Sequence, residues 1–530
     1  MSTTLTMLTA PKARPSWDPR HEPCVPTVSL DGEVADLSLL DVLFRAEELA
    51  TLACPTPGEG VAVLEHLLAV CFASGVHPSS TDEWCAWVAA SHPLTAAARW
   101  LAEQPPEEWD LFHPERPLGQ NSRLASLMPL SGTGPAQLVL ERAGDYLQFF
   151  DHHHLGHPEP LPAAAAFRAM LAQHVYGLSG RARLSGQEHG PRLTNLAAAR
   201  LQGRIRVVVQ SRTVADMLRL NLYPPAGGRV GQFNLSWTTG EIPRREFREK
   251  PPGRATTGPA DLHSYLGRSI LLRAAPGTEG GEVAVDRVLV GAGELLALDL
   301  DRDLEDAVFK EEATDGVRRP LWPSATRALW REAHALYSAA QNARQGLFGR
   351  LRLLEFPQET GGIPCRLWAV GLIADKTKPD AWTEGSFPYA PSQGEALCTA
   401  SRRGSVIADY LADSLKRAAF AASRVIYPNP KPSDKAAQQA RFDARKEFWP
   451  AAEDPFLRLL ADTALGSAVD TGLLRYADEL LACAEEFMRH RLDSLPHNAE
   501  GMQARARAEK SFADDLTKTR APEEIRKGRA

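Results

Sequence analysis

The chain has 530 residues, with 60 Lys and Arg against 66 Asp and Glu, and its apolar content is 44%. Domains usually contain about 50–250 residues, so the length indicates two or three domains, and the composition excludes a mainly disordered or fibrous protein. The formal net charge of −6 argues against a protein that coats nucleic acid through bulk charge, although it leaves room for a local basic site.

The N-terminal segment and the cysteines favour a soluble, cytoplasmic protein. Residues 1–20 contain three prolines and no apolar core, which is typical of a flexible leader rather than a signal peptide. The most apolar run, Val61–Val76, is shorter than the roughly 20 residues that span a bilayer. The seven cysteines are scattered and form no Cys-x-x-Cys pair, so neither a zinc ribbon nor a disulfide framework is predicted.

Residues 21–400 mix helical and strand-like patterns and predict a large, irregular α+β N-terminal domain. Apolar residues at helical spacing predict helices, and β-branched or alternating apolar runs predict strands. In chain order we expect helices at Leu39–Leu52, Val61–Ser74 and Pro93–Glu103, a strand at Tyr146–Phe150, a helix at Ala163–Tyr176, strands at Ile205–Gln210 and Val283–Val290, a helix at Ser324–Leu347, and strands at Leu351–Phe356 and Arg366–Ala374.

The composition changes near residue 400. Residues 401–530 carry 22 basic and 20 acidic residues, against 38 and 46 in residues 1–400. Amphipathic patterns with short connections predict an all-α C-terminal four-helix bundle over 401–495, followed by a charged helical tail over 496–530. Proline and glycine bound the expected helices, and Pro450 is expected to end the second. The four helices are expected at Gly404–Tyr427, Asp434–Trp449, Asp454–Leu465 and Thr471–Leu495.

The sequence lacks the common motifs of enzymes. It contains no phosphate-binding loop, no H-E-x-x-H and no G-x-S-x-G. The best catalytic candidate is the cluster Asp151–His157, in which Asp151, His152 and His154 could bind a transition metal. Adjacent residues of a strand point to opposite faces, so at most alternate histidines converge. The structural alternative is a polar loop that follows the strand at Tyr146–Phe150.

Arginine is concentrated in residues 181–219, which contain only two acidic residues, Glu188 and Asp216. Arginine can bind phosphate through paired hydrogen bonds. Gly177 and Gly180 precede the segment, and glycine lets the backbone approach another polymer closely. We predict a nucleic-acid contact here, with a solvated arginine-rich face as the alternative. The arginines are Arg181, Arg183, Arg192, Arg200, Arg204, Arg206, Arg212 and Arg219, and a second basic cluster comprises Arg244, Arg245, Arg248, Lys250 and Arg254.

A polar turn follows the strand expected at Arg366–Ala374. Asp375, Lys376, Thr377 and Lys378 form this turn. A tip presented from a rigid strand could enter a DNA groove, whereas the structural alternative is an ordinary surface hairpin.

Several short elements, in this order, resemble the large-subunit (CasA) family of the type I-E CRISPR surveillance complex, Cascade. Glu22–Thr27 is similar to that family's opening E-P-W-I-P-V, with Cys24 in place of Trp and Thr27 in place of Val. The matches span about residues 21–490 of this chain. The other elements are Gly32–Val34, Leu37–Leu40, Trp109–Phe112, Arg116–Gln120, Phe149–His152, Asp261–Tyr265, Ser269–Leu272, Pro320–Trp322 and Phe448–Trp449.

The resemblance implies a non-catalytic subunit that needs no cofactor and no metal. In that family the subunit probes duplex DNA for the short protospacer-adjacent motif, starts strand separation and helps to recruit a helicase-nuclease, while the guide RNA reads the sequence. The implied partners are double-stranded target DNA, the other Cascade subunits, CRISPR RNA and the helicase-nuclease, with no membrane. Two alternatives stay open: a metal-dependent nuclease or hydrolase that uses Asp151–His154, and a purely structural assembly subunit.

The resemblance also implies positions for the DNA contacts. The family's glycine loop at the minor groove corresponds to Gly177–Arg183, and its wedge between base pairs to Asp375–Lys378, where Asp-Lys stands in place of Asn-Gln. Arg273 or a residue of Gly277–Gly281 is the candidate minor-groove cation, and Ser122–Gln137 is expected to reach the RNA-bearing subunits. The expected DNA-binding residues are Gly177, Gly180, Arg181, Arg183, Arg204, Arg206, Asp375, Lys376, Thr377 and Lys378.

Overall fold

The computed structural model describes residues 15–142, 159–181, 195–240, 242, 253–275, 282–311, 318–354, 365–375 and 378–527. The chain divides into two compact units. The first comprises Met1–Ala307, Pro320–Ala325 and Val370–Glu384, and the second comprises Val308–Arg319, Thr326–Ala369 and Gly385–Ala530. Helices and strands are mixed through the first part of the chain, and helices follow from Gly394 onward, so the predicted α+β class is confirmed.

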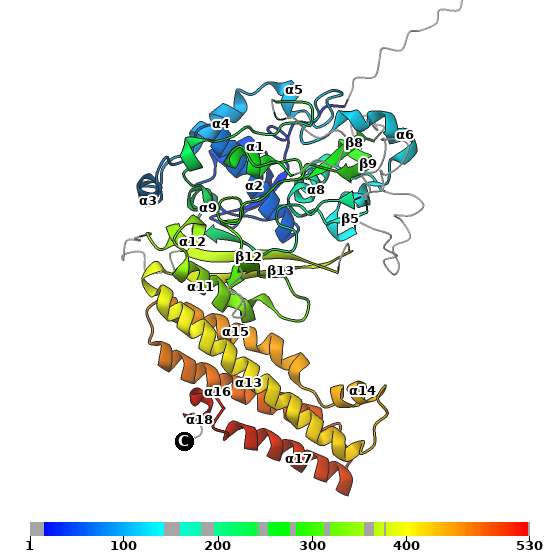
Figure 1. Ribbon diagram of the computed structural model, residues 1–530, viewed down its shortest axis with the longest axis vertical. Helices are drawn as coiled ribbons and strands as arrows, with labels where there is room; N and C mark the ends of the chain where they lie inside the picture. Colours follow the sequence, from blue (N-terminus) through cyan, green and yellow to red (C-terminus); the bar gives the residue numbers. More distant parts are fainter. Residues whose placement is uncertain are drawn as a thin grey trace, which may run out of the picture. The chain divides into compact units, whose positions relative to one another are not determined.

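Two buried helices form the centre of the first unit. Helix α2 (Pro57–Ala73) is capped by Thr56, whose hydroxyl oxygen accepts a hydrogen bond from the Glu59 amide, and Pro57 occupies its first turn. Almost all of its residues are buried, as expected of a helix that is apolar on every side. It packs against α8 (Ala163–Tyr176) and α10 (Pro259–Ser264), as Figure 1 shows for α2 and α8.

Several small sheets accompany these helices. In one, β1 (Val25–Ser29) lies between β2 (Val34–Leu37) and β3 (Leu49–Leu52). In another, β9 (Ala284–Ala292) lies between β4 (Leu161–Pro162) and β8 (Arg268–Ala274). A third sheet has the order β13–β12–β7, and a pair joins β5 to β6. The strands of these last two are β5 (Gly180–Arg181), β6 (Asn195–Leu196), β7 (Arg206–Gln210), β12 (Cys365–Asp375) and β13 (Lys378–Tyr389).

Shorter elements complete the part of the chain before Gly394. The helices are α1 (Leu39–Phe44), α3 (Thr81–Ala89), α4 (Thr95–Ala102), α5 (Pro106–Trp109), α6 (Met128–Ser131), α9 (Val214–Asn221), α11 (Ala333–Asn342) and α12 (Gly346–Leu351). A two-stranded sheet pairs β10 (Phe309–Glu311) with β11 (Arg318–Pro320).

Several predicted elements differ from the structure. The helix expected at Leu39–Leu52 ends at Phe44, and Leu49–Leu52 is a strand that pairs with β1. The helix expected at Ser324–Leu347 is divided into α11 and α12. The strand expected from Leu351 is wrong where the structure describes it, because Leu351 ends α12. The strand expected at Tyr146–Phe150 lies outside the described residues.

Four long helices build most of the second unit. Helix α13 (Gly394–Ile426) packs against α15 (Arg445–Ala464), α16 (Val469–Leu492) and α17 (Ala499–Leu516), and these helices run side by side in Figure 1. Helix α17 lies within the segment expected to be a charged helical tail. The short helices α14 (Lys435–Ala440) and α18 (Glu523–Lys527) complete the described residues of this region.

The expected helix end at Pro450 is wrong. Helix α15 continues through both Pro450 and Pro455, although a proline inside a helix removes one hydrogen bond and crowds the preceding turn. Phe448, Phe456 and Leu459 of this helix are buried, and their packing offsets the loss. Helix α13 also begins ten residues earlier than expected, at Gly394.

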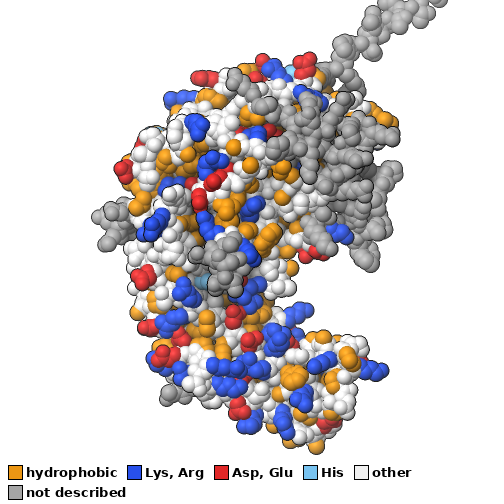
Figure 2. Space-filling model, in the orientation of Figure 1, with side chains coloured by type: hydrophobic (Ala, Val, Ile, Leu, Met, Phe, Trp, Pro, Cys, Tyr) orange, Lys and Arg blue, Asp and Glu red, His pale blue; other side chains and the backbone are white. Residues whose placement is uncertain are grey.

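The exposed surface carries charges of both signs. On the face shown in Figure 2, Lys and Arg side chains are intermingled with Asp and Glu over the first unit, and they are the more numerous of the two over the C-terminal helices. Among the helices that the structure describes, none has both the length and the apolar character needed to cross a bilayer.

Candidate nucleic-acid interface

The glycine segment, which we define as Gly177–Arg181, leaves the C-terminal end of α8. Helix α8 ends at Tyr176, and Gly180 and Arg181 then pair with Leu196 and Asn195 of β6. Residues 182–194 come between these two strands in the sequence and lie outside the described residues, and the predicted contact Arg183 is one of them. Only the backbone of Arg181 is described.

Arg268 hydrogen-bonds to both segments that form this strand pair. Its side chain is buried, and its Nη1 donates hydrogen bonds to the carbonyl oxygens of Ala197 and Gly267, both at 2.8 Å. Its Nη2 donates to the carbonyl oxygen of Leu178 at 2.7 Å. One guanidinium group therefore fixes the glycine segment to the chain that returns from β6.

Gly177 has a structural reason to be glycine. A Cβ atom at this position would lie 2.6 Å from Nη2 of Arg268 and 2.5 Å from the carbonyl oxygen of Gln173, which is closer than real Cβ contacts. Gly177 therefore makes room for Arg268, whether or not its backbone also approaches DNA.

Arg206 belongs to a buried ionic network. Its Nε lies 3.1 Å from Oε1 of Glu65 and 3.0 Å from Oδ2 of Asp306, and only 2% of the residue is exposed. Arg200 pairs with the same two carboxylates. Burial by itself raises the pKa of Glu65, but the charges of Arg200, His263 and Arg206 outweigh it and hold that pKa well below its usual range.

These contacts assign Arg206 a structural role in place of the expected contact with DNA. A guanidinium that is enclosed by protein and paired with two carboxylates has no surface to offer a phosphate. Arg219 is buried in the same way and pairs with Asp216 and Glu47, so part of the arginine-rich segment stabilises the first unit.

Arg204 is half-buried and lies two residues before β7. Its Nη1 donates to the carbonyl oxygen of Arg200 at 2.7 Å. Burial, together with the charge of Arg200, lowers its pKa, although arginine stays protonated in proteins. Its carbonyl oxygen lies 3.2 Å from the point that a Cβ of Gly371 would occupy, so Arg204 lies directly beside β12.

The predicted wedge lies at the tip of the β12–β13 hairpin. Two residues connect the strands, and only antiparallel strands can be joined so tightly. Asp375 and Lys378 flank the turn and are exposed. Lys376 and Thr377 lie outside the described residues.

Trp382 joins the hairpin to the glycine segment. Its ring packs edge-on against Tyr176, with the ring centroids 4.9 Å apart and the planes at 85°. Its Nε1 donates a hydrogen bond to the Glu141 carboxylate, and the ring covers the backbone of Gly58, where any Cβ would collide with it. Tyr176 immediately precedes Gly177. The structure therefore brings together two segments that are almost 200 residues apart in the sequence.

The segment Ser122–Gln137 packs against the β8–β9 hairpin. Leu124, Leu127 and Met128 form a small apolar cluster with Leu289 of β9. Leu130 also belongs to this segment and is 84% exposed.

The candidate minor-groove cation, Arg273, is exposed on β8 and forms an ion pair with Asp286 at 2.6 Å. The other candidates, Gly277–Gly281, lie outside the described residues. In the second basic cluster, Arg254 pairs with Asp261 and Glu294, and its other four members are not described.

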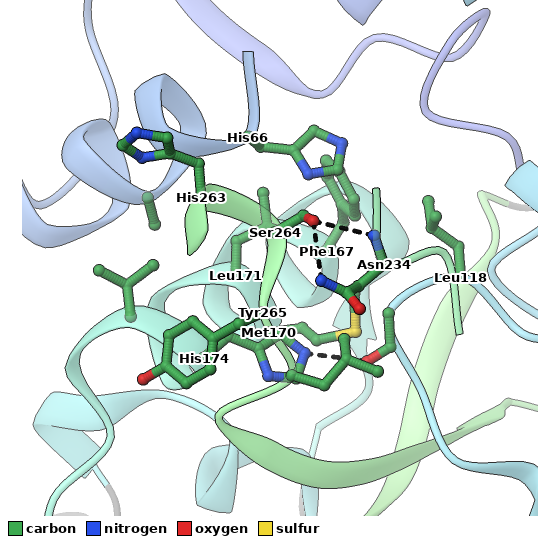
Figure 3. Close-up of a pocket in the computed structure, with 14 residues that line it drawn as sticks. His66, Leu118, Phe167, Met170, Leu171, His174, Asn234, His263, Ser264 and Tyr265 are labelled. Carbon is green, nitrogen blue, oxygen red and sulfur yellow. Dashed lines mark hydrogen bonds between the residues drawn. The ribbon is translucent and has the colours of Figure 1, made fainter. Parts of the chain in front are cut away.

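No described group of histidine, cysteine, aspartate and glutamate is arranged to hold a metal ion. The cluster Asp151–His157 lies outside the described residues. A small internal cavity beside α8 is lined by His66, His174 and His263 (Figure 3). Its volume of about 20 Å³ suits one water molecule rather than a substrate. Burial lowers the pKa of both His66 and His174 to about 4.

Arg268 and Trp382 were not predicted from the sequence. Neither belongs to a motif, and each acts through partners that are distant in the sequence. The only sequence signal for either residue was the position of Trp382, four residues after the polar turn that ends at Lys378.

Comparisons with known proteins agree on one family. The model of the CRISPR-associated protein Cse1 family matches residues 21–492. The structure of CasA from Thermus thermophilus is similar, with 19% identity, a TM-score of 0.73, and coverage of 95% of this chain and 99% of that one. Cse1 from Acidimicrobium ferrooxidans is similar at 20% identity, with a TM-score of 0.73 and coverage of 97% of this chain and 100% of that one. A chain of a CRISPR RNA-guided surveillance complex is similar at 22% identity, with a TM-score of 0.65 and coverage of 94% of this chain and 100% of that one. No curated protein matches this chain.

Proposed function

The chain belongs to the Cse1 family, the large-subunit family of the type I-E Cascade surveillance complex, and from this premise we propose that it recognises target DNA. In this role it reads a short motif in duplex DNA, begins the separation of the two strands, and catalyses no reaction. Its partners are the duplex, the other Cascade subunits with their CRISPR RNA, and a helicase-nuclease that it helps to recruit.

The proposal rests on one observation: the glycine segment and the hairpin are held together by the contact between Trp382 and Tyr176. Trp382 packs on Tyr176, and the glycine segment begins at the next residue. Two segments fixed to one frame can act on the same stretch of duplex, one along the backbone and one between base pairs.

Each segment suits a different task. Backbone amides and arginines of the glycine segment and of residues 182–194 would bind phosphates, which position a protein without reading the sequence. The hairpin tip would enter between base pairs beside the motif. Such an insertion costs a few kcal/mol per unstacked step, so a tip held by two long, paired strands is better suited to it than a loose loop.

Contact with the rest of the complex is assigned to Ser122–Gln137. This segment is held against β9 by its apolar cluster, and the exposed Leu130 offers an apolar anchor. The same part of the surface would bring the chain close to CRISPR RNA through the subunits that carry it.

The salt dependence of duplex binding tests the proposed DNA contact. In the assembled complex, Arg181→Ala combined with Arg183→Ala should weaken binding to motif-bearing duplex. Each phosphate contact that is lost lowers the slope of log K against log salt by about 0.9, so the slope should decrease by about 1 to 2.

A matched control replaces two exposed arginines of the second unit, Arg402 and Arg507, by alanine. This variant should keep the slope of the wild type. An unchanged slope for the Arg181 and Arg183 variant would remove these residues from the proposed interface. If the variant instead lost crosslinks to CRISPR RNA, the arginines would serve assembly rather than DNA binding.

A further inference from the structure

An exposed tryptophan lies beside the hairpin, on the short segment Pro320–Ala325 that belongs to the first unit. Trp322 is 64% exposed. Its ring rests on the backbone of Gly203, because a Cβ at that position would lie 2.3 Å from ring atom Cζ3. Gly203 also has φ +66°, a conformation that other residues rarely adopt. The glycine thus lets the indole approach the backbone closely, while most of the ring stays open to solvent.

The support beneath this ring is firmly held. The Leu201 amide donates to the carbonyl oxygen of Val175, and the Ala199 amide donates to that of Gly177, both at 3.0 Å. These bonds tie the turn at Gly203 to the end of α8 and to the glycine segment. A ring held in this way loses little conformational entropy when it binds a flat partner.

Trp322 is also joined to the hairpin through its neighbour. Pro323 packs on Gly371 of β12, where a Cβ would lie 2.7 Å from the proline ring. Residues 371 and 375 share one face of the strand, because side chains alternate with a period of two. The four residues of strand from Gly371 to Asp375 span about 13 Å. This length corresponds to about four nucleotide steps along one strand of B-form DNA.

We propose that Trp322 is a stacking platform for an unpaired base of the DNA strand that is separated at the hairpin tip. The inference rests on the proposed function, because it needs separated strands next to Asp375. Aromatic rings bind single strands of any sequence, since every base has a flat π face. The half-buried cation Arg204, next to Gly203, adds a favourable potential for the phosphates of such a strand.

The test uses the assembled complex and a DNA bubble whose unpaired region begins next to the motif. 2-Aminopurine is placed at successive positions of each unpaired strand, because its fluorescence falls when it stacks on a ring. One position should be quenched by the wild-type complex and recover in Trp322→Ala, whereas Trp322→Phe should keep most of the quenching. Affinity for the bubble should fall by roughly 5- to 150-fold in Trp322→Ala.

A matched control is Met502→Ala, which removes a 72% exposed apolar side chain from α17 in the second unit, and it should leave quenching and affinity unchanged. The proposal is overturned if no position differs between wild type and Trp322→Ala. It is also overturned if Trp322→Ala fails to join the complex, because the ring would then be a subunit contact. A parallel arm with fully paired DNA separates the two proposals: quenching on the bubble without opening of the duplex supports the platform but contradicts the proposed strand separation.

Discussion

The substitution Trp382→Ala tests whether the hairpin is held in place by its contact with α8. Truncation of a fully buried aromatic residue costs about 3–5 kcal/mol. Because Trp382 is half-buried, we expect a loss of about 2 kcal/mol from the packing on Tyr176 and the hydrogen bond to Glu141. That loss should appear as local opening rather than as global unfolding, because Trp382 lies near the tip of the hairpin and is itself only half-buried.

Amide hydrogen exchange measured by mass spectrometry reports this opening directly. A loss of about 2 kcal/mol makes exchange roughly 30-fold faster, and the increase should be confined to peptides that cover residues 378–384 and 174–181. Trp382→Phe keeps an aromatic ring against Tyr176 but loses the N–H donor, so its increase should be about fivefold.

The matched control is Trp87→Ala, which removes another half-buried tryptophan of the first unit, one that stacks on His92. This variant should leave exchange in the hairpin unchanged. If exchange over residues 378–384 stayed within threefold of wild type in Trp382→Ala, the anchoring role of Trp382 would be refuted.

Two further predictions concern buried charge and titration. Arg206→Met should lower the free energy of unfolding by about 3–5 kcal/mol, because Glu65 loses a buried partner. The folded complex should keep the wild-type salt dependence of duplex binding. A weaker salt dependence together with an unchanged urea midpoint would contradict this structural role. The folded-state pKa of His66 is about 4 and its unfolded value is about 6.5, so the stability that it contributes is present above pH 6.5 and is lost as the pH falls toward 4. Between pH 7 and pH 5 one such histidine lowers the free energy of unfolding by about 2 kcal/mol. In urea unfolding, the stability of His66→Phe should therefore fall about 2 kcal/mol less than that of the wild type over this interval. An equal fall in both proteins would contradict the low pKa of His66.

The fold could be predicted where the signals are local. Helix α8 has the predicted bounds because Pro162 precedes it and Gly177 follows it. Strands β7 and β12 were recognised from their apolar runs. Leu49–Leu52 was misread because its strand character depends on pairing with β1, which the local pattern of apolar residues does not reveal.

The site could be predicted only in part, for a related reason. The arginine-rich segment looked uniform in the sequence, yet Arg206 finds its carboxylate partner Glu65 141 residues away. Such a pair is created by the packing of α2 against distant segments, and composition alone cannot distinguish it from an exposed arginine. The join between hairpin and glycine segment likewise depends on Trp382, whose partners come from three separate parts of the chain.

The yield of R-loops on linear, motif-bearing DNA tests the central claim most directly. Linear DNA supplies no supercoiling to assist strand separation, so the tip must offset an unstacking cost of a few kcal/mol. The double substitution Asp375→Ala with Lys376→Ala should lower the yield at least about tenfold while the complex assembles normally, and the matched pair Glu509→Ala with Lys510→Ala on α17 should have no effect. A normal yield from the fully assembled Asp375 and Lys376 variant would contradict the role of the hairpin in opening the duplex.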